Sequence, residues 1–341
     1  MSRTTGAPPP KKRATLRTIS ELTGLSQSTI SLSLRGGTAL QEETRKRIAE
    51  AAASVGYVPD RAGVRLRTGK TNVIALVLDG AEYSIDFTRN MIQGIGHAIQ
   101  GTRYHMNVMP EFAHSHSVDT VRYILENRTA DGIVLTHTSA RDPRVQLLMD
   151  ADFPFVTHGR TEFYSPHPYH DFHSEQFTRQ SVERLAGLGC KSVLLVIGGD
   201  PTNNYHTIVT NFERAAARLK LESRIISQTD EQETAVAQRQ LGRELARAKD
   251  RPDGIICDSE MRSICLISGL NDAGVRVPED MRFISKQTSA VLPAFFPAVD
   301  TVEEDIFSAG VELTRLLLRR IAGEPAASLQ SLAEPTTHWK S

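Results

Sequence analysis

The chain has 341 residues but little cysteine and no long apolar segment. Its three cysteines, Cys190, Cys257 and Cys265, are too few and too scattered for a disulfide framework or a cysteine-based zinc site, which favours a reducing compartment. No apolar run reaches the roughly 18 residues of a membrane-spanning helix, and this excludes an integral membrane protein. The first residues lack the apolar core of a secretory signal, so we expect a cytoplasmic protein.

The sequence also lacks the motifs of common catalytic and cofactor sites. No Ser/His/Asp or Cys/His order indicates nucleophilic catalysis, and Gly198-Gly199-Asp200 is not a GxGxxG phosphate loop. His167, His170 and His173 have a spacing that metal sites use, but they occupy a segment rich in tyrosine and proline, without the helical His-x3-His pattern. We therefore expect no enzyme activity, no cofactor and no metal.

Net charge is absent over the whole chain, because 40 Lys and Arg balance 40 Asp and Glu. The balance conceals an asymmetry: residues 1–70 contain 13 basic and 5 acidic side chains, a surplus of eight positive charges. The rest of the chain carries the matching negative surplus. A basic module joined to an acidic body predicts a polyanionic partner at the N-terminal end.

Three short helices are expected in this basic module. Thr15 can cap the first helix, which Gly24 ends because glycine readily adopts the left-handed conformation. Ser26 can cap a second helix over residues 27–34, and a third is expected over residues 42–55. Two short helices joined by a glycine turn, with a third as support, form a helix-turn-helix unit.

The module therefore divides into three segments: a disordered basic arm (1–13), a helix-turn-helix DNA-binding domain (14–58) and a hinge helix or linker (59–70). The linker has helical spacing, but an isolated helix shorter than about 12 residues is marginal in water. Gly63 weakens this helix by roughly 1 kcal/mol more.

After residue 70, continuous apolar runs alternate with amphipathic segments. Such runs predict buried strands of parallel sheets with helices on both faces. The strands are expected at 72–78, 105–109, 132–136 and 154–157 in a first set, and at 192–199, 223–227, 254–257 and 282–285 in a second. Two α/β lobes follow, and ligands of this architecture bind beyond the carboxyl ends of the strands.

The N-terminal motifs resemble those of the lac repressor/galactose repressor (LacI/GalR) family of bacterial transcriptional regulators. The helix-turn-helix reads TLRTISELTGLSQSTIS from Thr15, TRKRI follows from Thr44, and GYVPDR and TGKT follow from Gly56 and Thr68. The resemblance covers about residues 14–340. It implies a homodimer that binds a pseudo-palindromic operator in double-stranded DNA and responds to a small molecule, commonly a sugar or sugar derivative.

The resemblance implies an all-α helix-turn-helix headpiece followed by a two-lobed, periplasmic-binding-protein-like α/β effector domain with parallel sheets (71–341). We expect one lobe to comprise about 71–171 with 302–328, and the other 172–301 with 329–341. The expected function is that of a repressor of a carbohydrate-utilisation operon. Two alternatives are an α/β enzyme acting on a sugar or anionic metabolite, and a small-molecule-binding protein without a role in gene control. Neither explains the basic module.

The start of the second helix is expected to face the base edges of DNA. Candidates for direct readout are Gln27, Ser28 and Ser31, since glutamine can bond adenine at two positions. Contacts elsewhere on the DNA, mainly to phosphates, are expected from residues at helix starts and in the hinge: Thr15, Ser26, Thr29, Arg35, Thr44, Arg61 and Arg67. The alternative for the hydroxyls is that they only cap helices.

Two positions depart from the family pattern in the DNA-reading region. Leu32 stands where many members have an arginine that can read guanine, and Arg35 stands where a small or amide side chain is common. We expect an altered operator sequence, with Arg35 on the DNA backbone because guanidinium geometry suits phosphate.

Leu66 matches the leucine that, in the family, enters a central minor-groove step from each subunit. An apolar wedge of this kind unstacks base pairs and kinks the duplex. The alternative is a buried linker residue.

The resemblance places the effector site in the loops that follow the strands. Phe87 matches an aromatic that often stacks on the ligand ring in the family, although it could equally be a core residue. His158, Arg160 and Asp171 could bond ligand hydroxyls, or Arg160 and Asp171 could form an ion pair near the hinge between the lobes.

The second lobe departs from the sugar-binding pattern of the family. Cys257-Asp258 replaces the usual Asn-Asp, and Lys286-Gln287 replaces the usual aromatic-Asp. Asn204 and Tyr205 lie nearby in the sequence and could substitute. A sugar is the expected effector, but Lys286 also suits an anionic or amino-sugar-like ligand unless an ion pair with Asp258 neutralises it.

Overall fold

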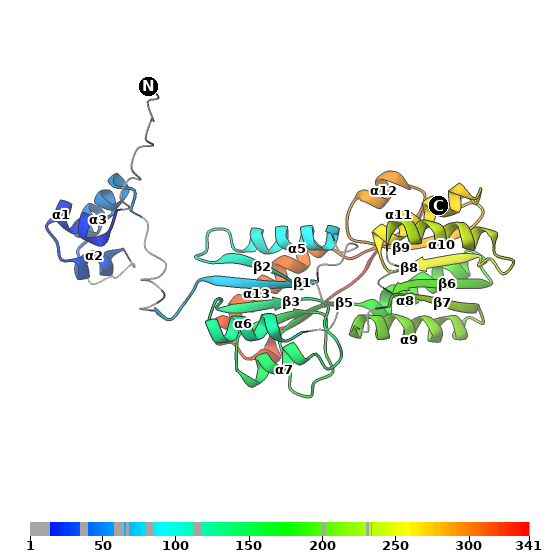
Figure 1. Ribbon diagram of the computed structural model, residues 1–341, viewed down its shortest axis with the longest axis horizontal. Coiled ribbons are helices and arrows are strands. Elements are labelled where there is room, and N and C mark those ends of the chain that lie inside the picture. Colours follow the sequence, from blue (N-terminus) through cyan, green and yellow to red (C-terminus); the bar gives the residue numbers. More distant parts are fainter. Residues whose placement is uncertain are drawn as a thin grey trace, which may run out of the picture. The chain divides into compact units, whose positions relative to one another are not determined.

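The computed structural model describes residues 14–34, 40–57, 65, 68–79, 85–111, 117–199, 202–229, 232 and 234–340. The chain divides into two compact units, Met1–Thr71 and Asn72–Ser341, and each contains hydrophobic cores of its own (Figure 1). Within the described ranges, no helix has the length and apolar character needed to cross a membrane.

The first unit contains the three predicted helices: α1 (Leu16–Thr23), α2 (Gln27–Ser33) and α3 (Glu42–Ser54). Thr15 caps α1, because its hydroxyl accepts a hydrogen bond from the amide of Thr18 and its own amide donates to the Thr18 hydroxyl at 3.1 Å. Gly24 ends α1 with a φ of +67°, and Ser26 caps α2 by accepting from the amide of Thr29 at 3.2 Å. These local predictions are confirmed.

A small core holds the three helices together. It is centred on one isoleucine from each helix, Ile19, Ile30 and Ile48, all fully buried. Full burial of such a side chain contributes roughly 1.5–3 kcal/mol. The guanidinium of Arg47 also donates a hydrogen bond to the carbonyl oxygen of Thr23, which ties α3 to the end of α1.

The second unit consists of two lobes, each built on a six-stranded sheet (Figure 1). The first sheet has the order β11-β5-β4-β3-β1-β2, with β1 (Val73–Asp79), β2 (His105–Glu111), β3 (Gly132–Leu135), β4 (Phe155–His158), β5 (Tyr169–Phe172) and β11 (Gln330–Ala333). The second has the order β12-β10-β9-β8-β6-β7, with β6 (Ser192–Gly198), β7 (Glu222–Gln228), β8 (Gly254–Cys257), β9 (Arg282–Gln287), β10 (Asp300–Glu303) and β12 (Thr336–His338). The paired strands run parallel except β10 and β12, as the apolar runs predict.

Helices cover both faces of each sheet, because strands with side chains that are apolar on both faces must be shielded on both. On the first sheet, one face packs against α5 (Ile85–Ala98) and α13 (Ile306–Ile321), and the other against α6 (Asp119–Asn127) and α7 (Pro143–Asp150). On the second sheet, one face packs against α8 (Ser174–Gly187) and α9 (Asn203–Arg218), and the other against α10 (Ala235–Arg247), α11 (Glu260–Asp272) and α12 (Val291–Phe295).

The lobe boundaries near the C-terminus differ from the expectation. The expected division cuts through β10, which lies wholly in the second sheet. It also places 329–341 in the second lobe, whereas β11 pairs in parallel with β5 in the first sheet. Only β12 returns to the second sheet. The expectation was wrong for β11 because this short strand, QSLA, is partly exposed and lacks the continuous apolar run that identified the inner strands.

Two pairs of helices approach each other closely at glycines. In the first lobe, Gly94 of α5 faces Gly310 of α13, and a Cβ atom at Gly94 would lie 2.2 Å from the carbonyl oxygen of Phe307. In the second lobe, Gly242 of α10 faces Gly269 of α11 in the same way. A methyl group at these positions would meet backbone atoms, which cannot rotate away as a side chain can.

Gly94→Ala is therefore expected to destabilise the protein by roughly 1–3 kcal/mol, because the helices must separate to admit the methyl group. Gly96→Ala is the matched control, since it lies in the same helix with nothing within 4 Å of a Cβ atom. That change should stabilise by up to about 1 kcal/mol through helix propensity. Denaturant unfolding of both variants measures the difference, and equal midpoints would contradict the close packing.

Candidate functional site

The start of α2 carries polar side chains on the surface of the first unit. Gln27 and Ser28 are exposed, whereas Thr29 and Ser31 are partly buried. The hydroxyl of Ser26 lies 2.8 Å from the hydroxyls of both Ser28 and Thr29, so these three form a capping cluster. Capping thus accounts for part of the predicted set, whereas base reading by the exposed side-chain amide of Gln27 stays a prediction.

The remaining predicted DNA contacts divide into described and undescribed residues. Thr44 is partly buried in the first turn of α3, where helix amides are available to phosphate. Arg35, Arg61, Leu66 and Arg67 lie outside the described residues. Their roles stay predictions.

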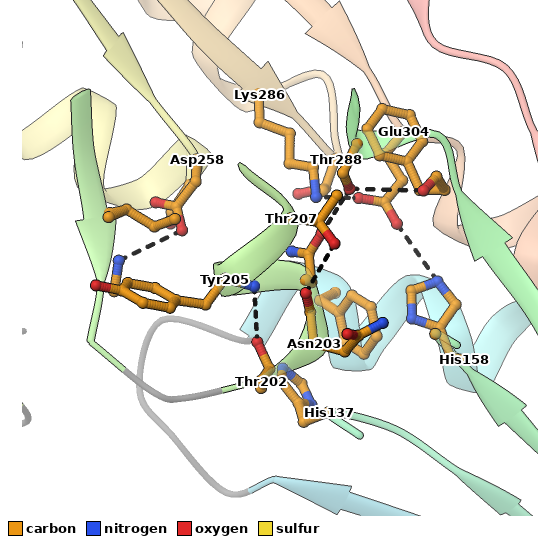
Figure 2. A pocket seen from close by; sticks show the side chains of 18 of the residues that line it. His137, His158, Thr202, Asn203, Tyr205, Thr207, Asp258, Lys286, Thr288 and Glu304 are labelled. Carbon is orange, nitrogen blue, oxygen red and sulfur yellow. Dashed lines mark hydrogen bonds and ion pairs between the residues drawn. The ribbon is translucent and has the colours of Figure 1, made fainter. Parts of the chain in front are cut away.

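A cavity of about 250 Å³ lies between the two lobes of the second unit, at the carboxyl ends of the parallel strands (Figure 2). Eight of the nine predicted effector residues line it: Phe87, His158, Arg160, Asp171, Asn204, Tyr205, Asp258 and Lys286. Hydrogen bonds join the lobes nearby. The side-chain amide of Asn90 donates a hydrogen bond to the carbonyl oxygen of Thr288 at 2.7 Å. The backbone amide of Asn203 donates a hydrogen bond to the carbonyl oxygen of Thr138 at 3.1 Å.

Glu304, which follows β10, is the central charge of the cavity and was not predicted. Its carboxylate lies 2.5 Å from Nζ of Lys286 and 3.3 Å from Nε2 of His158. Figure 2 shows all three side chains in the cavity. Burial alone would raise the pKa of Glu304, but the charge of Lys286 and the contact with His158 outweigh it and lower that pKa to about 2. The carboxylate therefore stays ionised and neutralises Lys286.

The two arginines among the described lining residues are also paired with carboxylates. The guanidinium of Arg160 lies 2.5 Å from Asp171 and 3.2 Å from Glu175, so the ion pair that the sequence left as an alternative is present. Asp258 pairs with Arg262 of α11 and not with Lys286, which corrects the alternative considered for that lysine. Arg262 stands one turn after Asp258, a helical spacing from which the pair could have been anticipated.

Polar groups at the start of α9 line the cavity on the side of the second lobe. Thr202 caps this helix by accepting a hydrogen bond from the backbone amide of Tyr205 at 3.1 Å (Figure 2). Asn203, Asn204 and Tyr205 therefore lie in the first turn of the helix. The amide oxygen of Asn204 accepts a hydrogen bond from the hydroxyl of Ser174 at 2.5 Å. These groups can exchange hydrogen bonds with ligand hydroxyls.

Aromatic rings line the cavity on the side of the first lobe. The ring of Phe87 lies 5.3 Å from the rings of both His137 and His158, in edge-to-face geometry. Phe87 borders the cavity and also packs against the core. Its stacking on a ligand ring stays a prediction. His137 was missed because it stands alone after β3, with no motif around it.

Gln287 is the predicted effector residue that does not line the cavity. Its side-chain oxygen accepts a hydrogen bond from the hydroxyl of Thr301 at 2.6 Å, and its carbonyl oxygen accepts from the amide of Glu304 at 2.9 Å. The prediction was wrong because successive residues of a strand point to opposite faces, and Lys286 takes the side of the cavity. Gln287 instead holds Glu304 in place.

The three histidines with metal-like spacing contact separate partners. His167 contacts the hydroxyl of Thr161 at 2.7 Å, His170 that of Ser331 at 2.9 Å, and His173 the carboxylate of Glu175 at 3.0 Å. Burial lowers the pKa of His170 to about 4, so this ring is neutral at physiological pH. Among the described residues, no group of three or more His, Cys, Asp or Glu side chains is arranged to hold a metal.

Comparisons with known proteins agree with this architecture. Residues 15–60 match the family described as bacterial regulatory proteins, lacI family, and residues 182–340 match the periplasmic binding protein-like domain. A relative is the HTH-type transcriptional regulator AglR of Rhizobium meliloti (strain 1021), 27% identical over 324 residues that cover 91% of this chain and 88% of the relative.

Two solved structures share the fold. One is the lac repressor dimer bound to operator and the anti-inducer ONPF, with a TM-score of 0.82 and 16% identity over 96% of this chain and 98% of that one. The other is the complex of the transcriptional regulator CelR with cellobiose, with a TM-score of 0.69 and 23% identity over the same shares. The fold class predicted from the sequence is confirmed, and the chain joins a helix-turn-helix region of the lacI family of bacterial regulatory proteins to a periplasmic binding protein-like domain.

Proposed function

We propose that the protein is a sequence-specific DNA-binding transcriptional regulator, a repressor rather than an enzyme, whose affinity for its operator is controlled by a neutral saccharide in the interlobe cavity. It acts in the cytoplasm, as a homodimer on a pseudo-palindromic operator. Residues 14–58 read the DNA, and residues 59–70 connect them to the effector domain, with Leu66 as the wedge.

The basic charge and the exposed first turn of α2 support the DNA-binding role. A helix-turn-helix presents the start of its second helix to the major groove, and Gln27 and Ser28 are exposed there. AglR, which is similar over most of its length, is named a transcriptional regulator.

The observation that favours a neutral ligand is the pairing of the basic side chains in the cavity. The arginine and lysine side chains among the described lining residues, Arg160, Arg262 and Lys286, each contact a carboxylate. An anionic ligand would have to displace one of these carboxylates, and the released buried charge would cost several kcal/mol. A neutral ligand rich in hydroxyls needs no such displacement. CelR, with the same fold, was solved with cellobiose, a neutral disaccharide.

Thermal unfolding in the presence of candidate ligands tests this choice. We expect one or more neutral saccharides among cellobiose, maltose and melibiose to raise the melting temperature, by mass action on the folded state. The gain is about 2.7 kcal/mol at 100 times the dissociation constant. Glucuronate and glucose 6-phosphate should have no comparable effect. Stabilisation by the anionic sugars alone would contradict the proposal.

A further inference from the structure

The loop after β3 contains an unusual backbone conformation. His137 has a φ of +52°, in the left-handed region that favours glycine. Four other described residues that are not glycine share this feature, and they are Asn72, Arg128, Asp152 and Lys220. None of those four lines the interlobe cavity, whereas His137 does. Strained backbone of this kind persists only where the surrounding structure enforces it, and it concentrates at functional sites.

The surrounding structure here is a buried guanidinium. Nη2 of Arg144 donates hydrogen bonds to the carbonyl oxygens of both Thr136 and His137, at 3.3 and 3.1 Å. Two consecutive carbonyl groups that accept from one nitrogen must turn toward the same point, which fixes the peptide planes around His137. The side chain of Arg144 is only 3% exposed, so water does not compete for these bonds.

Two carboxylates hold Arg144 in place. Asp142 is fully buried and lies 2.8 Å from Nη2, and Glu111 at the end of β2 lies 2.6 Å from Nη1. Burial would raise the pKa of Asp142, but its hydrogen bonds with Arg144 lower that pKa overall. Asp142 therefore stays ionised near neutral pH. We call the group of Arg144, Asp142 and Glu111 the clamp. The clamp thereby connects the ends of β2 and β3 to the backbone of His137.

This arrangement determines where the imidazole ring lies. The ring of His137 borders the cavity (Figure 2). It lies 5.3 Å from the ring of Phe87, and its Nδ1 lies 3.1 Å from the hydroxyl of Thr136. The next residue, Thr138, accepts the hydrogen bond from Asn203 that joins the lobes. One clamped loop therefore supplies both an aromatic wall for the ligand and a contact across the cleft.

We propose that His137 is an effector-contacting residue that determines ligand specificity, and that Arg144 is a positioning residue that holds it in the left-handed conformation. The inference rests on the proposed saccharide binding and adds the residue that the ligand meets on the first lobe. A flat ring beside Phe87 suits the apolar face of a sugar ring, and a ring nitrogen can bond a hydroxyl.

Replacing His137 by residues that tolerate a positive φ distinguishes the effect of backbone strain on stability from the effect of the side chain on ligand binding. His137→Gly and His137→Asn should fold at least as stably as the unaltered protein, because glycine and asparagine accept the left-handed region. Both should raise the dissociation constant for the stabilising saccharide at least tenfold, measured by calorimetry. Lys220→Gly is the matched control, with a φ of +56° at an exposed position outside the cavity, and it should leave the dissociation constant unchanged.

Arg144→Lys tests the positioning role, since lysine keeps the charge but cannot repeat the bonds of a guanidinium. We expect it to weaken saccharide binding about tenfold in the unaltered background and less than twofold when His137 is already asparagine. Equal losses in both backgrounds would show that Arg144 acts only through general stability and would overturn its positioning role.

The outcomes also separate this inference from the proposed function. If the unaltered protein binds cellobiose, maltose or melibiose and His137→Gly binds it equally well, the inference fails and the proposed function stands. If none of the three stabilises the unaltered protein, the proposed ligand class fails and the inference falls with it.

Discussion

A chain shortened to residues 71–341 is expected to lose specific operator binding while it still folds and binds the effector. The reason is the division of the molecule into two units with separate cores, in which the basic charge and the helix-turn-helix belong to the first. Specific binding commonly exceeds non-specific binding by roughly 10³–10⁷-fold, so the loss should be complete in a mobility-shift assay. Retained binding to operator DNA would place the DNA-binding surface elsewhere.

Single substitutions in the full chain refine this test. Gln27→Ala should relax the preference at one base position by roughly 1–3 kcal/mol, because an amide that bonds a base edge is lost. Thr44→Ala should instead weaken all sequences about equally, since a phosphate contact carries no sequence information. Binding to a library of operator variants distinguishes the two. Identical sequence profiles for Gln27→Ala and the unaltered protein would exclude base reading by Gln27.

Glu304→Gln is expected to cost about 3–5 kcal/mol of stability, which is typical of removing one partner from a buried ion pair. The change leaves Lys286 charged at a position where its side chain is only 11% exposed. Denaturant unfolding measures the loss. Glu303→Gln is the matched control, because its pair with His338 is more than a third exposed on both sides, and it should change stability by less than about 1 kcal/mol.

The loss should also depend on pH. The pKa of Glu304 in the folded protein, about 2, lies below its ordinary value of 4.5, so its ionisation stabilises the fold above the ordinary value. That contribution is lost as the pH falls from about 4.5 through 2. The difference between the unaltered protein and Glu304→Gln should therefore be full at pH 6 and shrink on acidification. A difference that stays constant to pH 2.5 would contradict the ion pair.

The same variant should change ligand preference. Without its carboxylate partner, Lys286 becomes a buried cation that an anionic sugar can neutralise. Glucose 6-phosphate should then stabilise Glu304→Gln but not the unaltered protein. We therefore expect the identity of residue 304 to decide whether the cavity binds a neutral or an anionic effector.

The amino-acid sequence determined the local structure of the first unit. The caps at Thr15 and Ser26 and the stop at Gly24 depend on groups within about four residues of each other, so they could be read directly and agree with the structure. The inner strands of both sheets were predicted for a related reason. Each is a continuous apolar run, and burial on both faces requires that composition wherever the strand lies.

Tertiary structure decided which charged residues meet. Lys286 could have paired with Asp258, but the register of β9 beside β10 brings it to Glu304, and Asp258 pairs within its own segment. The short strand β11 joined the first sheet for a similar reason: its place is set by pairing with β5, more than 150 residues earlier in the chain. His137 acquired its conformation from Arg144 and the carboxylates around it. Local pattern specifies the helices and strands because it depends on neighbouring residues, whereas the chemistry of the cavity depends on partners that are distant in the sequence and that only tertiary packing brings together.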